Sequence, residues 1–466
     1  MSESLIQKQA DVLGLSTAIL LPSVDLFGLP VRRAVGPLTQ VVGIGLFQRT
    51  VLTLQRAGIR QLIVLVGQEE DQLKQALSKG PRLTIPVRWM PIREFPLDDP
   101  RTWEALAAEV HGFCLLSGVG GVFSRQLVEQ LRREVQAGQA IAVAREVRGG
   151  GSHGSAVGRL LPAFGPSQSQ ETAAVAADLA VVSASMLSST VHAGSGSTPV
   201  RRWLEHAAAE GRLRLFTGEN DPSWWYQPVR NAADIQAAER KLFNSLKSEF
   251  EGFVDRYFNR KLSRWFTRVF LALGFSPNAI TIVATIVGLI AAAGFGLGTY
   301  VTGVVAALLF QLAAVIDCCD GEVARLTFTE SPFGAWLDIA LDNVVHMAIF
   351  GGIAVGAYMQ APGSEQAWIS LALGAAAITG NALSFLLVSR AQKIGQASGW
   401  KTPEQATWSD FMLKNVASRD FSVVVLAFAL VGKLQWFLWV ATGGSIVFVL
   451  IMLWVVRPSA VTVTKT

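Results

Sequence analysis

Hydrophobic and polar positions divide the 466-residue chain into two parts of different character. Between residues 17 and 216, short apolar runs such as QLIVLVG alternate with amphipathic stretches such as EEDQLKQALS. Because strands joined by crossover helices give that alternation, it predicts a soluble, Rossmann-like α/β domain with a mostly parallel sheet over residues 1–240. Nearly every long apolar run lies after residue 279, where a different kind of structure is expected.

The second part predicts an all-α, six-helix transmembrane domain over residues 276–466. Its apolar stretches approach the length of about 20 residues that a helix needs to cross a bilayer. They lie at 279–299, 302–324, 334–359, 367–389, 416–432 and 435–456, and the fifth is the shortest. Residues 241–275 predict a linker and then an amphipathic helix on the membrane surface, with Trp265 and Phe266 at the interface.

Composition and charge agree with a membrane protein. Charged residues make up 16% of the chain, against about 25% in an ordinary soluble domain. The net charge is +5, but the basic residues flank the apolar runs, which favours a membrane surface over nucleic acid as the partner. The expected inner loops hold Arg325, Arg390, Lys393, Lys401, Lys414 and Arg419, and the outer loops only Lys433. This asymmetry predicts an inner-membrane protein with both termini in the cytoplasm.

Four aspartates fall within the second and third predicted spans, in the stretch DCCDGEVARLTFTESPFGAWLDIALD. Spacings of three and four place Asp317 with Asp320, and Asp338 with Asp342, on one face of each helix. A charge near the bilayer centre costs about 3 kcal/mol or more, which argues against a cluster that serves packing alone. Converging carboxylates would repel one another, so we expect divalent cations, and all-oxygen ligation favours Mg²⁺ or Mn²⁺ over zinc. Two such ions can clamp a diphosphate.

The same stretch resembles the signature DxxDGxxARx(8)GxxxDxxxD of the CDP-alcohol phosphotransferase family. All eight fixed positions match: Asp317, Asp320, Gly321, Ala324, Arg325, Gly334, Asp338 and Asp342. The resemblance implies an enzyme that transfers a phospho-alcohol group from a CDP-alcohol to an acceptor hydroxyl and releases CMP. It implies that the four aspartates bind two metal ions, that Asp342 is also the catalytic base, and that Gly321, Ala324, Arg325 and Gly334 bind the cytidine nucleotide.

Upstream residues extend the likeness to one branch of that family. The stretch EGFVDRYFNRKLSRWFTRVFLALGFSPNAITIVATIVGL resembles the branch fused to inositol-1-phosphate cytidylyltransferase, the di-myo-inositol phosphate phosphate synthases. That branch uses a phosphorylated polyol as the acceptor, which implies a basic pocket beside the metals. Arg260, Lys261, Arg390 and Lys393 are candidates, with contacts to lipid headgroups as the alternative. Family likeness also implies a homodimer.

The first domain resembles the nucleotidyltransferase fold of this branch, in the stretch GPLTQVVGIGLFQRTVLTLQRAGIRQLIVLVG, but lacks its catalytic residues. PSVDLFGLPVRR replaces the glycine-rich loop that cradles triphosphate, and Gly36 stands at the position of the lysine. Val119 stands where the metal-binding aspartate is expected, and WWYQP contains no aspartate. We therefore expect a catalytically silent domain, retained for assembly, docking or regulation.

Two other functions could also use aspartates within membrane spans. The same motif serves phospholipid synthases that use CDP-diacylglycerol, since lipid can enter between the helices from the bilayer. An ion-binding transporter would also hold intramembrane aspartates, but near the midplane and in a repeated topology. Here the acids cluster at the ends of two consecutive predicted spans, and the sequence shows no second copy of the pattern.

Overall fold

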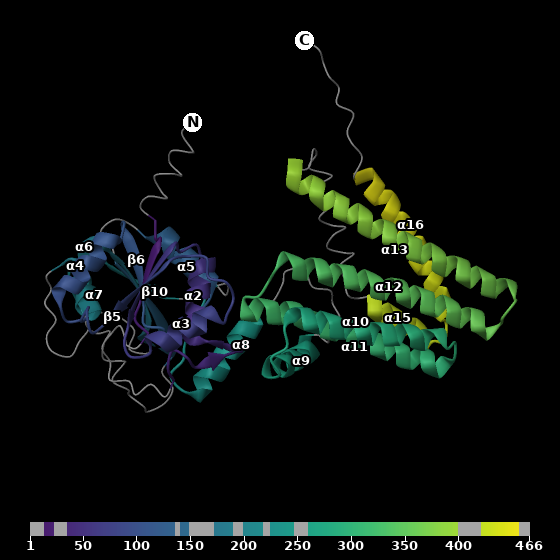
Figure 1. Ribbon diagram of the computed structural model, residues 1–466, viewed down its shortest axis with the longest axis horizontal. Helices are drawn as coiled ribbons and strands as arrows, with labels where there is room; N and C mark the ends of the chain where they lie inside the picture. Colours follow the sequence, from purple (N-terminus) through teal and green to yellow (C-terminus); the bar gives the residue numbers. More distant parts are fainter. Residues whose placement is uncertain are drawn as a thin grey trace, which may run out of the picture. The chain divides into compact units, whose positions relative to one another are not determined.

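The computed structural model describes residues 14–22, 35–135, 140–148, 172–189, 199–217, 224–246, 260–398 and 421–455. The chain forms two compact units, residues 1–245 and 246–466, each of which has its own core. The first is an α/β unit and the second is helical throughout its described residues (Figure 1).

The first unit is built on a seven-stranded sheet in the order β10-β8-β9-β6-β1-β4-β5. Its strands are β1 (Thr17–Leu20), β4 (Gln61–Val66), β5 (Val87–Pro91), β6 (Phe113–Ser117), β8 (Ala140–Arg148), β9 (Thr172–Ser183) and β10 (Leu213–Thr217). Every described pair is parallel except those that β9 makes with β6 and β8. The prediction of a mostly parallel sheet is therefore confirmed.

Helices cover both faces of this sheet (Figure 1). The helices of the first unit are α2 (Leu46–Arg56), α3 (Glu70–Ser78), α4 (Pro100–Glu109), α5 (Arg125–Glu134), α6 (Ala184–Leu187), α7 (Pro199–Ala209) and α8 (Ala232–Ser245), of which α8 lies away from the sheet (Figure 1). Two small antiparallel pairs complete the unit: β2 (Gln40–Val41) with β3 (Ile44–Gly45), and β7 (Gly121–Phe123) with β11 (Tyr226–Pro228).

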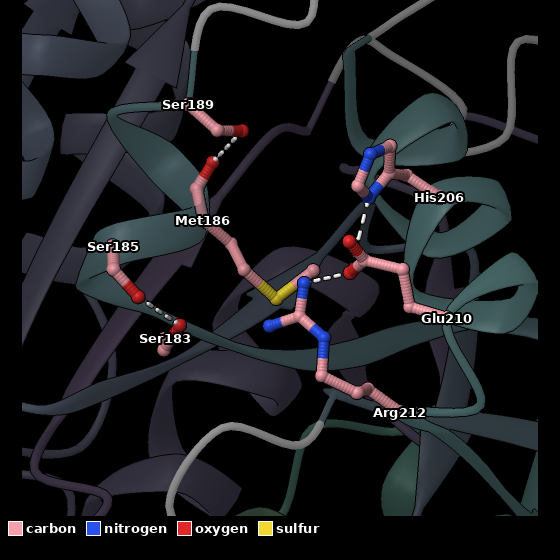
Figure 2. A network of polar contacts seen from close by, with 7 residues as sticks. All are labelled: Ser183, Ser185, Met186, Ser189, His206, Glu210 and Arg212. Atoms are coloured by element: carbon pink, nitrogen blue, oxygen red, sulfur yellow. Dashed lines mark hydrogen bonds and ion pairs between the residues drawn. The ribbon is translucent and has the colours of Figure 1, made fainter.

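Apolar burial, rather than surface charge, holds α7 to the sheet. Trp203 on α7 is 2% exposed and meets Trp103 of α4 edge to face, with 4.9 Å between ring centroids. At the end of α7, Glu210 pairs with His206 and Arg212 (Figure 2). These three side chains are 41% to 55% exposed, so each pair contributes no more than about 1 kcal/mol.

The second unit contains a short amphipathic helix followed by long apolar helices. They are α9 (Arg260–Ala272), α10 (Pro277–Gly296), α11 (Tyr300–Thr327), α12 (Pro332–Gln360), α13 (Glu365–Ser398), α15 (Phe421–Leu430) and α16 (Leu434–Val455). Among the described residues, five helices are long and apolar enough to cross a membrane: α10, α11, α12, α13 and α16. The predicted span 416–432 lies partly outside the described residues, and its described part is the ten-residue α15.

Local capping signals set the ends of the helices around the aspartates. Ser276 and Ser331 each cap a helix that begins with proline, accepting hydrogen bonds from the N–H of Ala279 (3.3 Å) and of Gly334 (2.9 Å). Phe328, with a φ of 60°, ends α11. The chain can therefore reverse between Thr327 and Pro332, as the sequence predicts.

Glycines bring the backbones of α10 and α12 into direct contact. Gly352 and Gly356 lie one turn apart on α12 and face the carbonyl oxygens of Ala292 and Phe295, leaving no room for a Cβ atom at either glycine. Such small-residue stripes allow close helix packing in membranes. The contact fixes α12, which carries Asp338 and Asp342, against the rest of the bundle.

Candidate metal centre

Three of the four aspartates converge. Asp317 and Asp320 come from α11 and Asp338 from α12, and each offers a carboxylate oxygen that lies within 4.8 Å of the other two. Asp317 and Asp320 are 6% and 7% exposed, and Asp338 is partly buried. The spacing of three on α11 and the reversal before α12 bring the carboxylates together, as the sequence predicts.

Asp342 lies one helical turn beyond Asp338 on α12 and is partly buried. The cluster found among the described residues does not include it. Its role as a metal ligand and catalytic base therefore stays a prediction, based on its position in the motif and on the same helix face as Asp338.

The chemistry of the cluster fits a hard divalent cation. All three candidate ligands are carboxylates, the oxygen donors that Mg²⁺ and Mn²⁺ prefer. Carboxylates held this close repel one another when all are charged, and a bound cation removes that repulsion. Asp317, Asp320 and Asp338 are thus the residues that would hold the metal.

Asp320 is oriented by its neighbours. The hydroxyl of Thr281 on α10 donates to Asp320 Oδ2 at 2.5 Å, and the N–H of Gly321 donates to Asp320 Oδ1. Thr281 is itself buried, at 3% exposure. Residues that hydrogen-bond a metal-ligating carboxylate fix its direction, so Thr281 is a supporting residue that sequence reasoning missed.

A second acid on α11, Glu322, was also missed. It is buried, and it accepts hydrogen bonds from Ser263 Oγ to Oε1 (3.1 Å) and from Thr267 Oγ1 to Oε2 (2.7 Å), both on α9. A charged residue in an apolar helix was the available signal. Its partners lie more than 50 residues earlier in the chain, so the sequence could not identify them.

The residues predicted to bind the nucleotide lie around the ends of α11 and α12. A Cβ atom at Gly334 would be 3.1 Å from both Asn278 Oδ1 and Ser331 Oγ, so other chain segments approach this glycine closely. Gly321 faces the guanidinium of Arg325, which is exposed, and Ala324 is partly exposed. The nucleotide-binding role of these residues stays a prediction.

Four basic residues are predicted to bind the acceptor, and the structure describes the side chain of one of them. Arg390 is exposed on α13. Arg260 and Lys261 begin α9, and Lys393 follows Arg390 on α13, but the side chains of these three lie outside the described part of the structure. The predicted basic pocket is neither supported nor contradicted by these positions.

In the first unit, bulky and polar side chains fill the place of the expected metal aspartate. Val119, directly after β6, is 3% exposed and has a φ of 56°. The carboxylate of Asp178 occupies the space beside Gly118, and the hydroxyl of Tyr226 accepts from the Asp178 N–H at 3.2 Å. The only metal-type cluster among the described residues is the one in the membrane unit. Residues 23–34, most of the atypical loop, lie outside the described residues.

Comparison with known proteins relates the membrane unit to a family. Residues 275–462 match the CDP-alcohol phosphatidyltransferase family. Enzymes of the family depend on divalent metal, which agrees with the carboxylate cluster. Helix α9 lies before the matched residues.

Two of the similar proteins share one name. The "Bifunctional IPC transferase and DIPP synthase" of Aquifex aeolicus is 32% identical over 135 residues, 28% of this chain and 30% of that protein. The match thus spans less than a third of the relative. The protein of the same name from Rubrobacter xylanophilus is 26% identical over 412 residues, 84% of this chain and 85% of that protein. An inositol-1-phosphate CTP transferase structure from T. maritima covers 51% of this chain and 98% of its own, with 13% identity and a TM-score of 0.36.

Proposed function

We propose that this protein is a metal-dependent CDP-alcohol phosphotransferase of the membrane. It transfers a phospho-alcohol group from a CDP-alcohol to an acceptor hydroxyl and releases CMP. The observation that carries the proposal is the convergence of Asp317, Asp320 and Asp338 from two apolar helices, within a domain of the CDP-alcohol phosphatidyltransferase family. The cofactors are two divalent cations, Mg²⁺ or Mn²⁺.

The chain supplies positioning and proton transfer. Asp317, Asp320, Asp338 and Asp342 would hold the cations, which would supply positive charge to neutralise the diphosphate of the donor and the leaving CMP. Asp342 accepts the proton of the acceptor hydroxyl, whose oxygen forms a bond to the phosphorus that carries the alcohol. The bond from that phosphorus to the bridging oxygen breaks, and CMP leaves with the electron pair. Gly321, Ala324 and Gly334 give the cytidine space beside the backbone, and Arg325 contacts its phosphates.

The acceptor is a phosphorylated polyol of the inositol phosphate class. The name shared by the Aquifex and Rubrobacter relatives supports this choice, and the Rubrobacter protein is similar along most of this chain. Arg260, Lys261, Arg390 and Lys393 bind the acceptor phosphate in this proposal. CDP-diacylglycerol remains the alternative donor, because proteins named archaetidylinositol phosphate synthase and phosphatidylinositol phosphate synthase are also similar to this domain.

The test measures CMP release by the purified full-length protein with Mn²⁺ or Mg²⁺, supplied either with a CDP-polyol and a polyol phosphate or with CDP-diacylglycerol and a polyol phosphate. We expect CMP from the first pair, and a loss of about 100-fold or more in Asp317→Asn and Asp342→Asn. Glu365→Gln, an exposed change at the start of α13, is the matched control and should retain activity. CMP from neither donor would reject the proposal, and CMP from the lipid donor alone would select the alternative.

A further inference from the structure

A buried carboxylate joins the metal-binding helix to the helix that precedes the family domain. Glu322 on α11 is 8% exposed, and each of its two oxygens accepts a hydrogen bond from a different hydroxyl of α9. Both hydroxyl residues, Ser263 and Thr267, are fully buried and lie one turn apart. Helix α9 packs beside α11 (Figure 1).

This contact is energetically demanding. A carboxylate in an apolar site costs several kcal/mol unless hydrogen bonds replace its water. Apolar side chains would pack α9 on α11 without that cost, but they would leave the helix freer to slide. Two hydroxyls that must both reach one carboxylate allow a single axial position, so the contact fixes where α9 lies along α11.

The position of α9 is transmitted to the metal centre through α10. Phe270 of α9 packs in one cluster with Ile280 of α10 and Cys319 of α11. A short turn, in which Gly274 has a φ of 71°, connects α9 to α10. The first turns of α10 carry Thr281, whose hydroxyl donates to Asp320. A series of contacts therefore connects Glu322, through α9 and α10, to Asp320, the candidate metal ligand two residues before Glu322.

We propose that Glu322 is a positioning residue for the metal centre. By fixing α9 on α11, it sets the first turns of α10 and so the hydrogen bond from Thr281 to Asp320. The proposal rests on the proposed function to the extent that the aspartate cluster binds metal. In this proposal α9, which lies outside the matched family residues, helps to position the metal ligands.

Docking of α9 can be measured without any activity. Cys319 is fully buried, and its Sγ lies 3.5 Å from the carbonyl oxygen of Ser263, beneath α9. In the full-length protein we expect N-ethylmaleimide to leave Cys319 unmodified, as read by mass spectrometry of its peptide. Glu322→Ala should expose Cys319 to the reagent. Glu322→Gln should keep it protected, because the amide can hydrogen-bond both hydroxyls.

Because Glu322→Ala could prevent folding, a second variant tests the same contact with a smaller change. The double variant Ser263→Ala and Thr267→Val removes both donors, keeps the carboxylate, and should also expose Cys319. Ser370→Ala is the matched control, because the buried Ser370 hydroxyl donates to the Gln366 carbonyl of its own helix, at 3.0 Å. It should leave Cys319 protected.

The effect on metal is read from Mn²⁺ titrations, both as the rise in Tm of the protein and as CMP release. The Mn²⁺ concentration at half effect should rise about 10-fold or more in Glu322→Ala and less than about 2-fold in Glu322→Gln. If a variant were only less stable, the size of the Mn²⁺ effect would fall, but the Mn²⁺ concentration at half effect would stay unchanged.

Two results would overturn the inference. One is a Glu322→Ala protein in which Cys319 stays protected and the Mn²⁺ midpoint is unchanged. The other is a Glu322→Gln protein that keeps Cys319 protected but binds Mn²⁺ as weakly as Glu322→Ala, which would show that charge, and not docking, is what matters. If the wild type gains Tm with Mn²⁺ but releases no CMP, the proposed function fails, while the Tm titration still decides the role of Glu322.

Discussion

At the scale of single residues, the Thr281 hydroxyl holds one carboxylate of the cluster. Thr281→Val keeps the shape of the side chain and removes the donor to Asp320. We expect metal-dependent CMP release to fall by about 10-fold to 100-fold, with a higher Mn²⁺ requirement, because supporting hydrogen bonds to metal ligands contribute that much. Thr285→Val is the control, since the Thr285 hydroxyl donates to the Thr281 carbonyl of its own helix at 2.8 Å. Equal Mn²⁺ titrations for both variants would contradict the role of Thr281.

The site residues that the sequence predicted are those whose arrangement depends on neighbours close in the chain. Asp317 and Asp320 were placed on one helix face by their spacing alone, and the structure brings them to Asp338 as expected. Thr281 and Glu322 could not be found in this way, because their partners are 39 and more residues away and come from other helices. Nothing in a threonine at the start of an apolar run indicates that its hydroxyl faces a carboxylate.

At the scale of elements, the contact between α10 and α12 makes a sharp prediction about small residues. A Cβ atom at Gly356 would overlap the carbonyl oxygen of Phe295, which is backbone and cannot turn aside. Gly356→Ala should therefore lower the Tm and the metal-dependent activity together, with a cost of about 1 to 3 kcal/mol from overpacking. Gly443→Ala on α16 is the matched control, because nothing lies within 4 Å of its added Cβ.

The control should equal or slightly exceed the wild type in stability, since alanine favours helix over glycine. Equal Tm values for Gly356→Ala and Gly443→Ala would show that α10 and α12 are not in close backbone contact.

The length and periodicity of the apolar stretches predicted which helices and strands form. They did not predict the direction of each strand or which helices pack together. Five of the six predicted spans are confirmed as long apolar helices. The fifth, 416–432, stays a prediction, because residues 416–420 lie outside the described part of the structure. Helix α9 was expected, and Trp265 on it is 57% exposed, but its packing against α11 was not foreseen. In the sheet, β9 runs antiparallel to its neighbours, and a buried apolar strand carries no mark of its direction.

At the scale of the whole molecule, the distribution of basic residues predicts the orientation of this multi-pass protein. Lys433, exposed between α15 and α16, should lie outside, and the first unit should lie in the cytoplasm. A membrane-impermeant maleimide applied to intact cells should modify Lys433→Cys but not Ser78→Cys in the first unit. In inside-out vesicles the pattern should reverse. Modification of Ser78→Cys in intact cells would contradict the proposed inner-membrane topology.

From the two units we predict that the chain uses an activated donor, the CDP-alcohol, but does not synthesise it. In the first unit, the buried Val119 stands where the sequence predicts that a nucleotidyltransferase would have its metal-binding aspartate, so we expect no metal there to stabilise charge on a transferred phosphorus. The full-length protein supplied with CTP, a polyol phosphate and Mn²⁺ should therefore release no pyrophosphate, while it releases CMP once a CDP-alcohol is added.

Adding a separate, active cytidylyltransferase to the same mixture is the control, and it should restore both products from CTP. Pyrophosphate from the protein alone, undiminished in Asp317→Asn, would show that the first unit is catalytic after all. If none appears, the donor must come from an enzyme of the nucleotidyl-transfer class. We then expect the first unit to act through assembly, docking or regulation, because its described residues have a buried apolar core but no carboxylate cluster.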